Sequence, residues 1–240
     1  MSMSRSEDQH GALRRAIVAA DGQRVVAALS KGPLDELLQL AGDGLLIALV
    51  QDVEGARDLA QRCARRLRGR SWVGDDDLAD QLDATLHNRP APLLRPLPVD
   101  LEELSAVLEG DPAQGDGRID RRTGEVWAQV AIDDARDEGD EDPDDEDPDR
   151  WLAVWCEGSH AAYGDMEDFI AALADQDRAD RLSIAISGRG AFRRFKDVLE
   201  RWPDEREAWY VFSAERQRGR ARAWLAAAGY SPRVPERPST

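Results

Sequence analysis

Apolar residues recur every three or four positions through the first third of the chain, which is the pattern of amphipathic helices. Leu59, Cys63 and Leu67, for example, fall on one helical face. Pro33, after Gly32, is typical of a first helical position, where the missing N–H of proline costs nothing. No repeat is clear enough to indicate a solenoid. We expect helices over residues 12–20, 23–30, 33–42, 43–51, 54–69 and 75–86.

A proline-rich stretch ends this helical region. Four prolines between Asn88 and Pro98 disfavour helix at the preceding positions and stiffen the chain, so we place a domain boundary there. Terminal residues without an apolar pattern are expected to be poorly ordered. The predicted division is residues 1–8 disordered, 9–90 an all-α domain, 91–98 a linker, 99–230 a second domain and 231–240 a loose tail.

The second domain begins with a helix and a hairpin. Asp100 is a candidate N-cap for a helix within residues 99–110. Apolar positions then alternate with others from Val126 to Ile132, the period of a β-strand. Thr123-Gly124 supplies the turn because glycine accepts positive φ. Residues 118–132 are therefore predicted to form a hairpin.

A third strand and several helices complete the second domain. Residues 150–158 are apolar on both faces, which is typical of a central strand. Met166, Phe169, Ile170 and Leu173 share one helical face. Further helices are expected over residues 181–187, ended by Gly188 or Gly190, and over 191–202 and 207–229. The predicted fold class is α+β: an all-α N-terminal helical domain, then a small antiparallel sheet packed with C-terminal helices.

The second and third strands are joined by an acidic insertion over residues 133–149, with 12 acidic residues and one arginine. Self-repulsion and the lack of apolar anchors predict that it is disordered. A calcium loop of the EF-hand kind needs a glycine at its sixth position and a glutamate at its twelfth, and Gly139 does not fit that frame. We therefore expect a solvated linker and no calcium site.

Composition limits the partners and the location of the protein. The chain has 240 residues and a formal net charge of −16, which disfavours nucleic acid as a partner of the whole surface. No apolar run reaches the roughly 20 residues of a membrane helix, and the first residues lack a secretion signal. Cys63 and Cys156 are far apart and are expected to be reduced. These features predict a cytoplasmic protein without a membrane partner.

One cluster has ligands of the kind that zinc or a hydrolase would use. Cys156, Glu157 and His160 lie together, but a structural zinc site needs four ligands, and the other histidines, His10 and His87, are distant in sequence. A cysteine and histidine dyad is possible in principle. A lone pair of this kind is expected by chance, so we predict no catalytic residue, no metal and no cofactor.

A basic stretch from Gly188 to Pro203 combines a predicted core with a predicted surface. On a helix, Phe192, Phe195, Leu199 and Trp202 form one apolar stripe. From Gly188 to Arg222 there are ten basic and six acidic residues. The basic face is either a solvated surface, a dock for the acidic insertion, or a binding site for a polyanion or an acidic partner. The candidate binding residues are Arg189, Arg193, Arg194 and Lys196.

Five segments in the second half of the chain resemble a bacterial family, the uncharacterised protein family 0158 of the UPF series. They are VDLEELSAVLE, IDRRTGEVW, MEDFIAAL, GRGAFRRFKDVL and the spaced pair Trp209 and Phe212. The resemblance spans about Pro98 to Tyr230 and implies an α+β module with a short antiparallel sheet and C-terminal helices. It implies no catalytic residues, and the N-terminal helices and the acidic insertion lie outside it.

Three functional hypotheses follow. The first is a cytoplasmic interaction or regulatory protein without catalytic activity, whose partner is an unknown protein or an acidic ligand. The second is a nucleic-acid-binding protein that uses the local basic helix face, which the overall acidity disfavours. The third is a small hydrolase with a site that the sequence does not reveal.

Overall fold

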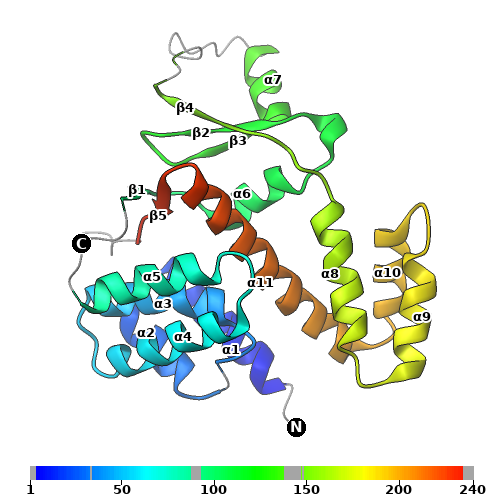
Figure 1. The fold of residues 1–240 in the computed structure, drawn as a ribbon, viewed down its shortest axis with the longest axis horizontal. Helices are drawn as coiled ribbons and strands as arrows, with labels where there is room; N and C mark the ends of the chain where they lie inside the picture. The colour runs from blue at the N-terminus through cyan, green and yellow to red at the C-terminus, as the bar shows by residue number, and fades with distance from the viewer. Residues whose placement is uncertain (1–3, 33, 88–92, 138–146, 148, 235–240) are drawn as a thin grey trace.

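The computed structural model describes residues 4–32, 34–87, 93–137, 147 and 149–234. Its first part is a group of helices, and its second part combines helices with two small sheets (Figure 1). This is the predicted mostly helical α+β class. The N-terminal helices are α1 (Ser4–Val18), α2 (Gly22–Leu29), α3 (Leu38–Val50), α4 (Ala56–Arg70) and α5 (Asp75–Leu86).

The apolar faces of these helices meet in one core. Leu59, Cys63 and Leu67 are buried together with residues from the neighbouring helices, as their spacing predicts. Asp21 begins α2 by accepting a hydrogen bond from the Arg24 N–H. The predicted helices over 54–69 and 75–86 are confirmed as α4 and α5.

Two predictions in this region are wrong. Residues 4–8 belong to α1, because polar residues can form a helix without an apolar period. The helices predicted over 33–42 and 43–51 are one helix, α3, and Pro33 lies outside the described residues. Gly42 and Gly44 lie at the expected boundary, and both serve close packing inside α3. A Cβ at Gly42 would lie 2.5 Å from a Leu78 methyl carbon, and one at Gly44 would lie 2.9 Å from a Val25 methyl carbon.

The predicted linker and tail each contain a short strand. Strand β1 (Arg95–Leu97) pairs in parallel with β5 (Tyr230–Pro232), which joins the start of the second region to its end. The linker prediction over 91–98 and the loose tail over 231–240 are therefore wrong at these positions. Strands of three residues that pair across most of the chain carry no local signal. Residues 88–92 and 235–240 lie outside the described part.

A three-stranded antiparallel sheet forms with the order β3-β2-β4. Its strands are β2 (Gly117–Asp120), β3 (Val126–Ala128) and β4 (Trp151–Val154). The hairpin is confirmed, with Gly124 at φ +80° in the turn. Two details differ. The central strand is β2, whereas β4 is an edge strand, and the hairpin ends at Ala128 because Val130 and Ile132 belong to a helix.

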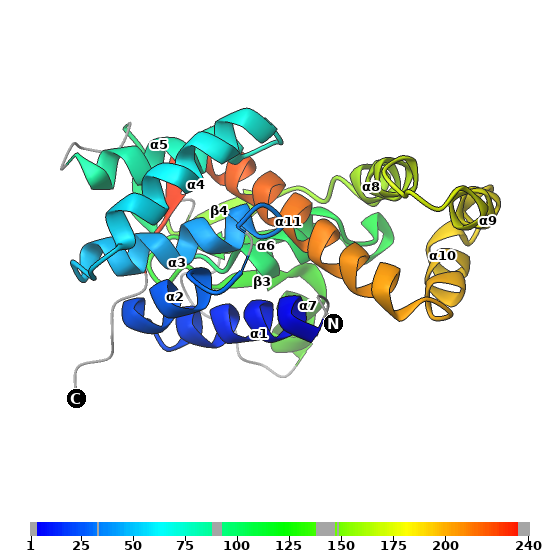
Figure 2. The same ribbon diagram turned by 90° about the horizontal axis from the view of Figure 1, so that it is seen from below.

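Helices occupy the rest of the second region (Figure 2). Asp100 caps α6, as predicted, by accepting from the N–H groups of Glu102 and Glu103. Gly190, at φ +77°, precedes α10. The helices are α6 (Leu101–Leu108), α7 (Gln129–Asp137), α8 (His160–Ala171), α9 (Gln176–Ile186), α10 (Ala191–Leu199) and α11 (Pro203–Ala227), with a short 3₁₀ turn at Pro112–Gln114.

Helix α11 runs through the middle of the molecule and contributes to all three hydrophobic clusters (Figure 1). Val211 packs with the N-terminal helices, and Trp209 packs with α8, α9 and α10. Ala221 and Leu225 pack with α6 and the three-stranded sheet. One helix thus joins both predicted domains, and their division remains a prediction.

The predicted disorder of the acidic insertion over 133–149 is wrong at its start, because residues 133–137 lie in α7. Residues 138–146 and 148 lie outside the described part. Asp147 accepts hydrogen bonds from the N–H groups of Asp149, Arg150 and Trp151, which form a turn before β4. Within the described residues, no helix combines the length and apolar character needed to span a bilayer.

Candidate functional site

Helix α10 has the two faces that its sequence predicts. Phe195 and Leu199 are each 1% exposed and pack with Phe169 of α8 and Trp209 of α11. Phe192 and Trp202 of the same stripe are half-buried against this cluster. The stripe therefore contributes to the core.

Three of the four candidate binding residues are exposed on and beside α10. The Arg193 side chain is 90% exposed, and its nearest carboxylate oxygen belongs to Asp197, 4.0 Å away. Arg189 and Lys196 are also exposed. Among the described residues, neither has a carboxylate within ion-pairing distance, so both charges face solvent.

Arg194 has a different position. Its guanidinium donates hydrogen bonds to the main-chain carbonyl groups of Ala185 (2.9 Å) and Ser187 (2.7 Å), and to those of Gly188 and Arg189. These carbonyls lie at and after the end of α9, where a cation stabilises the negative end of the helix dipole. Arg194 therefore holds the loop that carries Arg189.

Four other basic residues of this sequence region lie in the second half of α11 and are paired inside the molecule. Arg216 and Arg220 both contact Asp165, a fully buried carboxylate of α8. Arg218 lies between Asp43 (3.4 Å) and Glu102 (3.1 Å). Four of the ten positive charges between residues 188 and 222 are thus paired with carboxylates that are distant in sequence, whereas Arg206 pairs with the nearby Glu200 and Arg201 is exposed.

Arg222 is the most enclosed of these residues, at 1% exposed. It donates to Asp43 Oδ1 (2.5 Å), Gln39 Oε1 (3.0 Å) and Gln81 Oε1 (3.3 Å). These acceptors belong to α3 and α5. A side chain of the second region is therefore buried inside the N-terminal helices.

Glu215, also on α11, stabilises the start of α3. Leu37, at the N-cap position, has no side chain that can accept a hydrogen bond. The Glu215 carboxylate accepts instead from the N–H groups of Gln39 (2.7 Å) and Leu40 (2.9 Å), and from Arg70 (3.0 Å). Burial raises the pKa of Glu215, and Arg70 and the two N–H groups oppose this shift.

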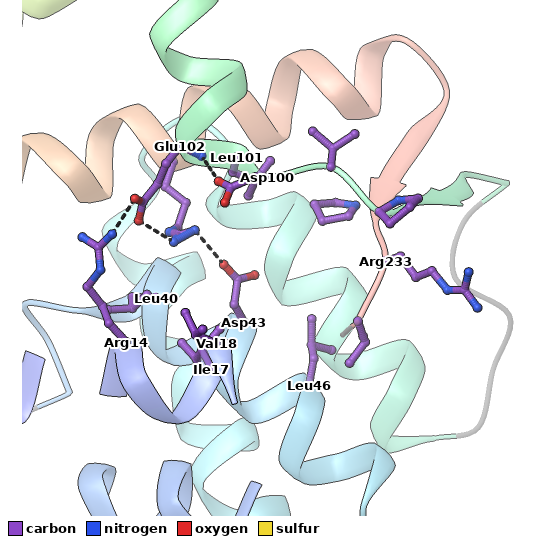
Figure 3. A pocket seen from close by; sticks show the side chains of 15 residues that line it. Arg14, Ile17, Val18, Leu40, Asp43, Leu46, Asp100, Leu101, Glu102 and Arg233 are labelled. Carbon is purple, nitrogen blue, oxygen red and sulfur yellow. Dashed lines mark hydrogen bonds and ion pairs between the residues drawn. The ribbon is translucent and has the colours of Figure 1, made fainter. Parts of the chain in front are cut away.

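A pocket of about 560 Å³ lies where the two regions meet (Figure 3). Apolar side chains from α1, α3, the segment between β1 and α6, the start of α6 and the end of β5 form much of its wall. Arg14, Glu102, Arg218 and Asp43 form a continuous line of ion pairs along one side. Arg233 lies on the opposite side from Arg14 and Glu102 (Figure 3). The apolar lining consists of Ile17, Val18, Leu40, Leu46, Pro98, Val99, Leu101, Pro232 and Val234.

The lining of this pocket suits binding better than covalent catalysis. None of its 15 residues is a serine, threonine, cysteine, histidine, tyrosine or lysine. Its carboxylates are already engaged, since Asp100 caps α6 while Asp43 and Glu102 accept from arginines. The volume is in the range of small-molecule sites, roughly 300–1,000 Å³. Sequence reasoning missed this pocket because its walls come from five separate segments.

The predicted cysteine and histidine cluster forms no metal site in the structure. The Cys156 N–H donates to Asp116 (2.8 Å), while His160 begins α8 and is exposed. Within the described residues, no group of three or more His, Cys, Asp or Glu side chains could hold a metal ion. Burial raises the pKa of the other thiol, Cys63, which is enclosed in the N-terminal core.

Helix α4 is a second basic segment that sequence reasoning missed. It carries six arginines and one aspartate, a stronger signal than α10 gives. Arg66, Arg68 and Arg70 are paired with carboxylates, and Arg57 donates to the Leu86 carbonyl. Arg62 and Arg65 are exposed, and in the described part of the chain no carboxylate pairs with them.

The described ends of the acidic insertion lie at the sheet and not at α10 (Figure 1). Arg122, in the turn between β2 and β3, pairs with Asp147 (3.3 Å). Arg121 donates to the Asp149 carbonyl (3.3 Å). Neither contact supports the hypothesis that the insertion docks on the basic face of α10.

The fold and its sites define a mostly helical α+β protein in which one long helix connects an α-helical region to a three-stranded sheet. The sequence pattern of the Uncharacterised protein family (UPF0158) matches residues 94–237, and the chain belongs to this family. A UPF0158 protein of Pseudomonas aeruginosa is 28% identical over 139 residues, which cover 55% of this chain and 84% of that protein. No solved structure matches. The matched span confirms the resemblance and includes α10 and α11, but leaves α1 to α5 outside.

Proposed function

We propose that this protein is an interaction protein without catalytic activity, and that an acidic partner binds the exposed basic face of α10. Arg189, Arg193 and Lys196 form this face. One observation carries the proposal: these charges face solvent, whereas the four arginines in the second half of α11 are paired internally.

Two further features support this surface. Arg194 fixes the loop before α10 through four main-chain carbonyls, so the cations sit on an ordered element. Ile184, near the end of α9 in the same hairpin, is 74% exposed. Arginine beside exposed apolar surface is typical of protein interfaces. The face also lies in the span that matches the family, unlike Arg62 and Arg65 of α4.

A direct binding measurement tests the proposal. The probe is a fluorescein-labelled 20-residue peptide rich in glutamate, titrated against the full chain. The Arg193→Ala, Lys196→Ala double variant should bind about fivefold more weakly, since each exposed ion pair contributes up to roughly 1 kcal/mol. The Arg62→Ala, Arg65→Ala variant removes the same charge from α4 and should bind like the unmodified protein.

Two outcomes would replace this proposal. If both double variants lose the same affinity, the peptide responds only to total charge. If a 20-nucleotide single strand of DNA binds more tightly than the peptide, with an affinity that falls steeply with salt and depends on Arg193 and Lys196, the nucleic-acid hypothesis takes its place.

A further inference from the structure

The line of ion pairs beside the pocket continues behind its wall (Figure 3). Arg14 and Arg218 both donate to Glu102, at 2.5 Å and 3.1 Å. Arg218 also lies 3.4 Å from Asp43, which accepts from the buried Arg222. Three arginines therefore share two carboxylates, and in the described part of the chain no other carboxylate lies within ion-pairing distance of them. The line carries one surplus positive charge.

The other charged groups around the pocket do not cancel this surplus. Asp100 and Arg233 are the remaining charged residues of the lining, and their charges are opposite. His10 on α1 adds no charge at neutral pH, because burial and the Arg14 cation lower the pKa of its imidazole. Charges elsewhere on this acidic chain have less influence, since salt at 0.1 M screens interactions beyond about 10 Å. The pocket is therefore locally positive.

Arg14 is the arginine of this line that a ligand can reach. Its side chain is 47% exposed, compared with 14% for Arg218. A guanidinium has five N–H donors. Within the described residues, Arg14 uses one of them, toward Glu102. Arg14 can therefore donate to a second anion without leaving Glu102.

Next to Arg14 the wall of the pocket is apolar. Ile17 and Val18 follow Arg14 by one turn of α1, and Leu40 and Leu46 of α3 line the same pocket (Figure 3). Val18 is 88% exposed, so an apolar group bound here would remove apolar surface from water. The volume of about 560 Å³ is sufficient for a small ligand. The pocket thus combines an apolar wall with one accessible cation.

We propose that this pocket binds a small molecule with an apolar body and a single carboxylate, which pairs with Arg14. A guanidinium matches a carboxylate in shape as well as in charge. A phosphate monoester carries nearly two negative charges at pH 7, which exceeds the one surplus charge. Because the walls come from both regions, the ligand would also hold α1 and α3 against α6. The site is separate from the basic face of α10 and does not depend on it.

Matched ligands test the proposal by isothermal titration calorimetry with the full chain. Octanoate should bind about tenfold more tightly than octan-1-ol, since a hydrogen bond to an ionised group is stronger than one to a neutral group. Octylamine has the opposite charge and should bind no more tightly than octan-1-ol. Butanoate should bind roughly tenfold more weakly than octanoate, because it buries fewer methylene groups. If octanoate does not bind, or binds no better than octan-1-ol or butanoate, the proposal is overturned.

Substitutions at two neighbouring arginines localise the binding. Arg14→Gln removes the cation and should lower the affinity for octanoate about tenfold, while the affinity for octan-1-ol stays the same. Arg15→Gln removes the same charge from a residue that is exposed and does not line the pocket, so it should leave both affinities unchanged. Both side chains are exposed, so neither change should prevent folding. Equal losses in the two variants, or a loss in the Arg193→Ala, Lys196→Ala variant, would show that octanoate binds through surface charge elsewhere and would overturn the proposal.

Discussion

Helices α10 and α11 are neighbours in sequence and both are rich in basic residues, yet these basic side chains lie in different environments. On α10, Arg193 and Lys196 face solvent, opposite the buried Phe195. On α11, Arg216 and Arg222 point into the molecule and pair with carboxylates of α8 and α3. A similar composition therefore produces an exposed basic surface on α10 and internal ion pairs on α11.

The difference comes from what surrounds each helix. Helix α10 packs against one cluster, whereas α11 has neighbours on most of its sides. A buried guanidinium is costly unless hydrogen-bond acceptors surround it. Asp43, Gln39 and Gln81 provide three such acceptors for Arg222. An arginine-rich segment therefore indicates an exposed basic surface only if the folded chain places no carboxylates beside its arginines.

The strongest test of this comparison is Arg222→Met. The variant leaves Asp43 and Gln39 without their buried partner, so we expect the free energy of unfolding to fall by about 3–5 kcal/mol. Urea denaturation followed by circular dichroism measures this loss. Arg193→Ala is the matched change on α10 and should alter the same quantity by less than about 0.5 kcal/mol. Equal losses would show that burial does not separate the two helices.

A second test concerns how closely α11 approaches the N-terminal helices. A Cβ added at Gly219 would lie 2.2 Å from the Val73 carbonyl oxygen, a distance that backbone atoms do not tolerate. Gly219→Ala should therefore destabilise the protein by about 2–3 kcal/mol in urea denaturation, comparable to overpacking of a core.

Gly69 in α4 is the control for this change. Nothing lies within 4 Å of a Cβ built there, so Gly69→Ala should stabilise the protein by roughly 0.5–1 kcal/mol through helix propensity. Two glycine-to-alanine changes in helices should thus have opposite signs. Stabilisation by both would disprove the close approach of α11.

Much of the helical architecture could be predicted from sequence because it depends on local periodicity. Leu59, Cys63 and Leu67 placed α4, and the stripe through Phe195 and Leu199 placed α10. Strands β1 and β5 could not be predicted, since each has three residues and its partner lies more than a hundred positions away. Short strands become stable only through such distant pairing.

The candidate site was predictable to a similar extent. Arg193 and Lys196 lie on the helical face opposite the apolar stripe, and this was enough to predict that they are exposed. The role of Arg194 was not predictable, because it depends on the carbonyls that the α9 terminus presents. Arg222 donates to Gln39, 183 residues earlier, so its burial could only be seen in the folded chain. The same holds for the pocket between the two regions.

Arg194 provides a third and smaller test within α10 itself. Arg194→Ala removes hydrogen bonds to the carbonyls after α9 and should lower the free energy of unfolding by about 1–2 kcal/mol. Arg193→Ala, one residue away, removes the same charge without these bonds. Arg194→Lys keeps the charge but cannot reach several carbonyls at once, so it should recover only part of the loss. Urea denaturation of the three variants measures the order, and equal stability of all three would contradict the positioning role.

The smallest expected effect is that of the exposed cations of α10 on stability. Arg193→Ala combined with Lys196→Ala should change the free energy of unfolding by less than about 0.5 kcal/mol, because neither side chain is buried or closely paired. The effect on binding should be larger, which separates a contact surface from a structural one. Thermal unfolding at low and high salt provides the measurement, since screening weakens exposed charges far more than buried pairs. A clear loss of stability at low salt would mean that these cations, like those of α11, belong to the internal framework of the fold.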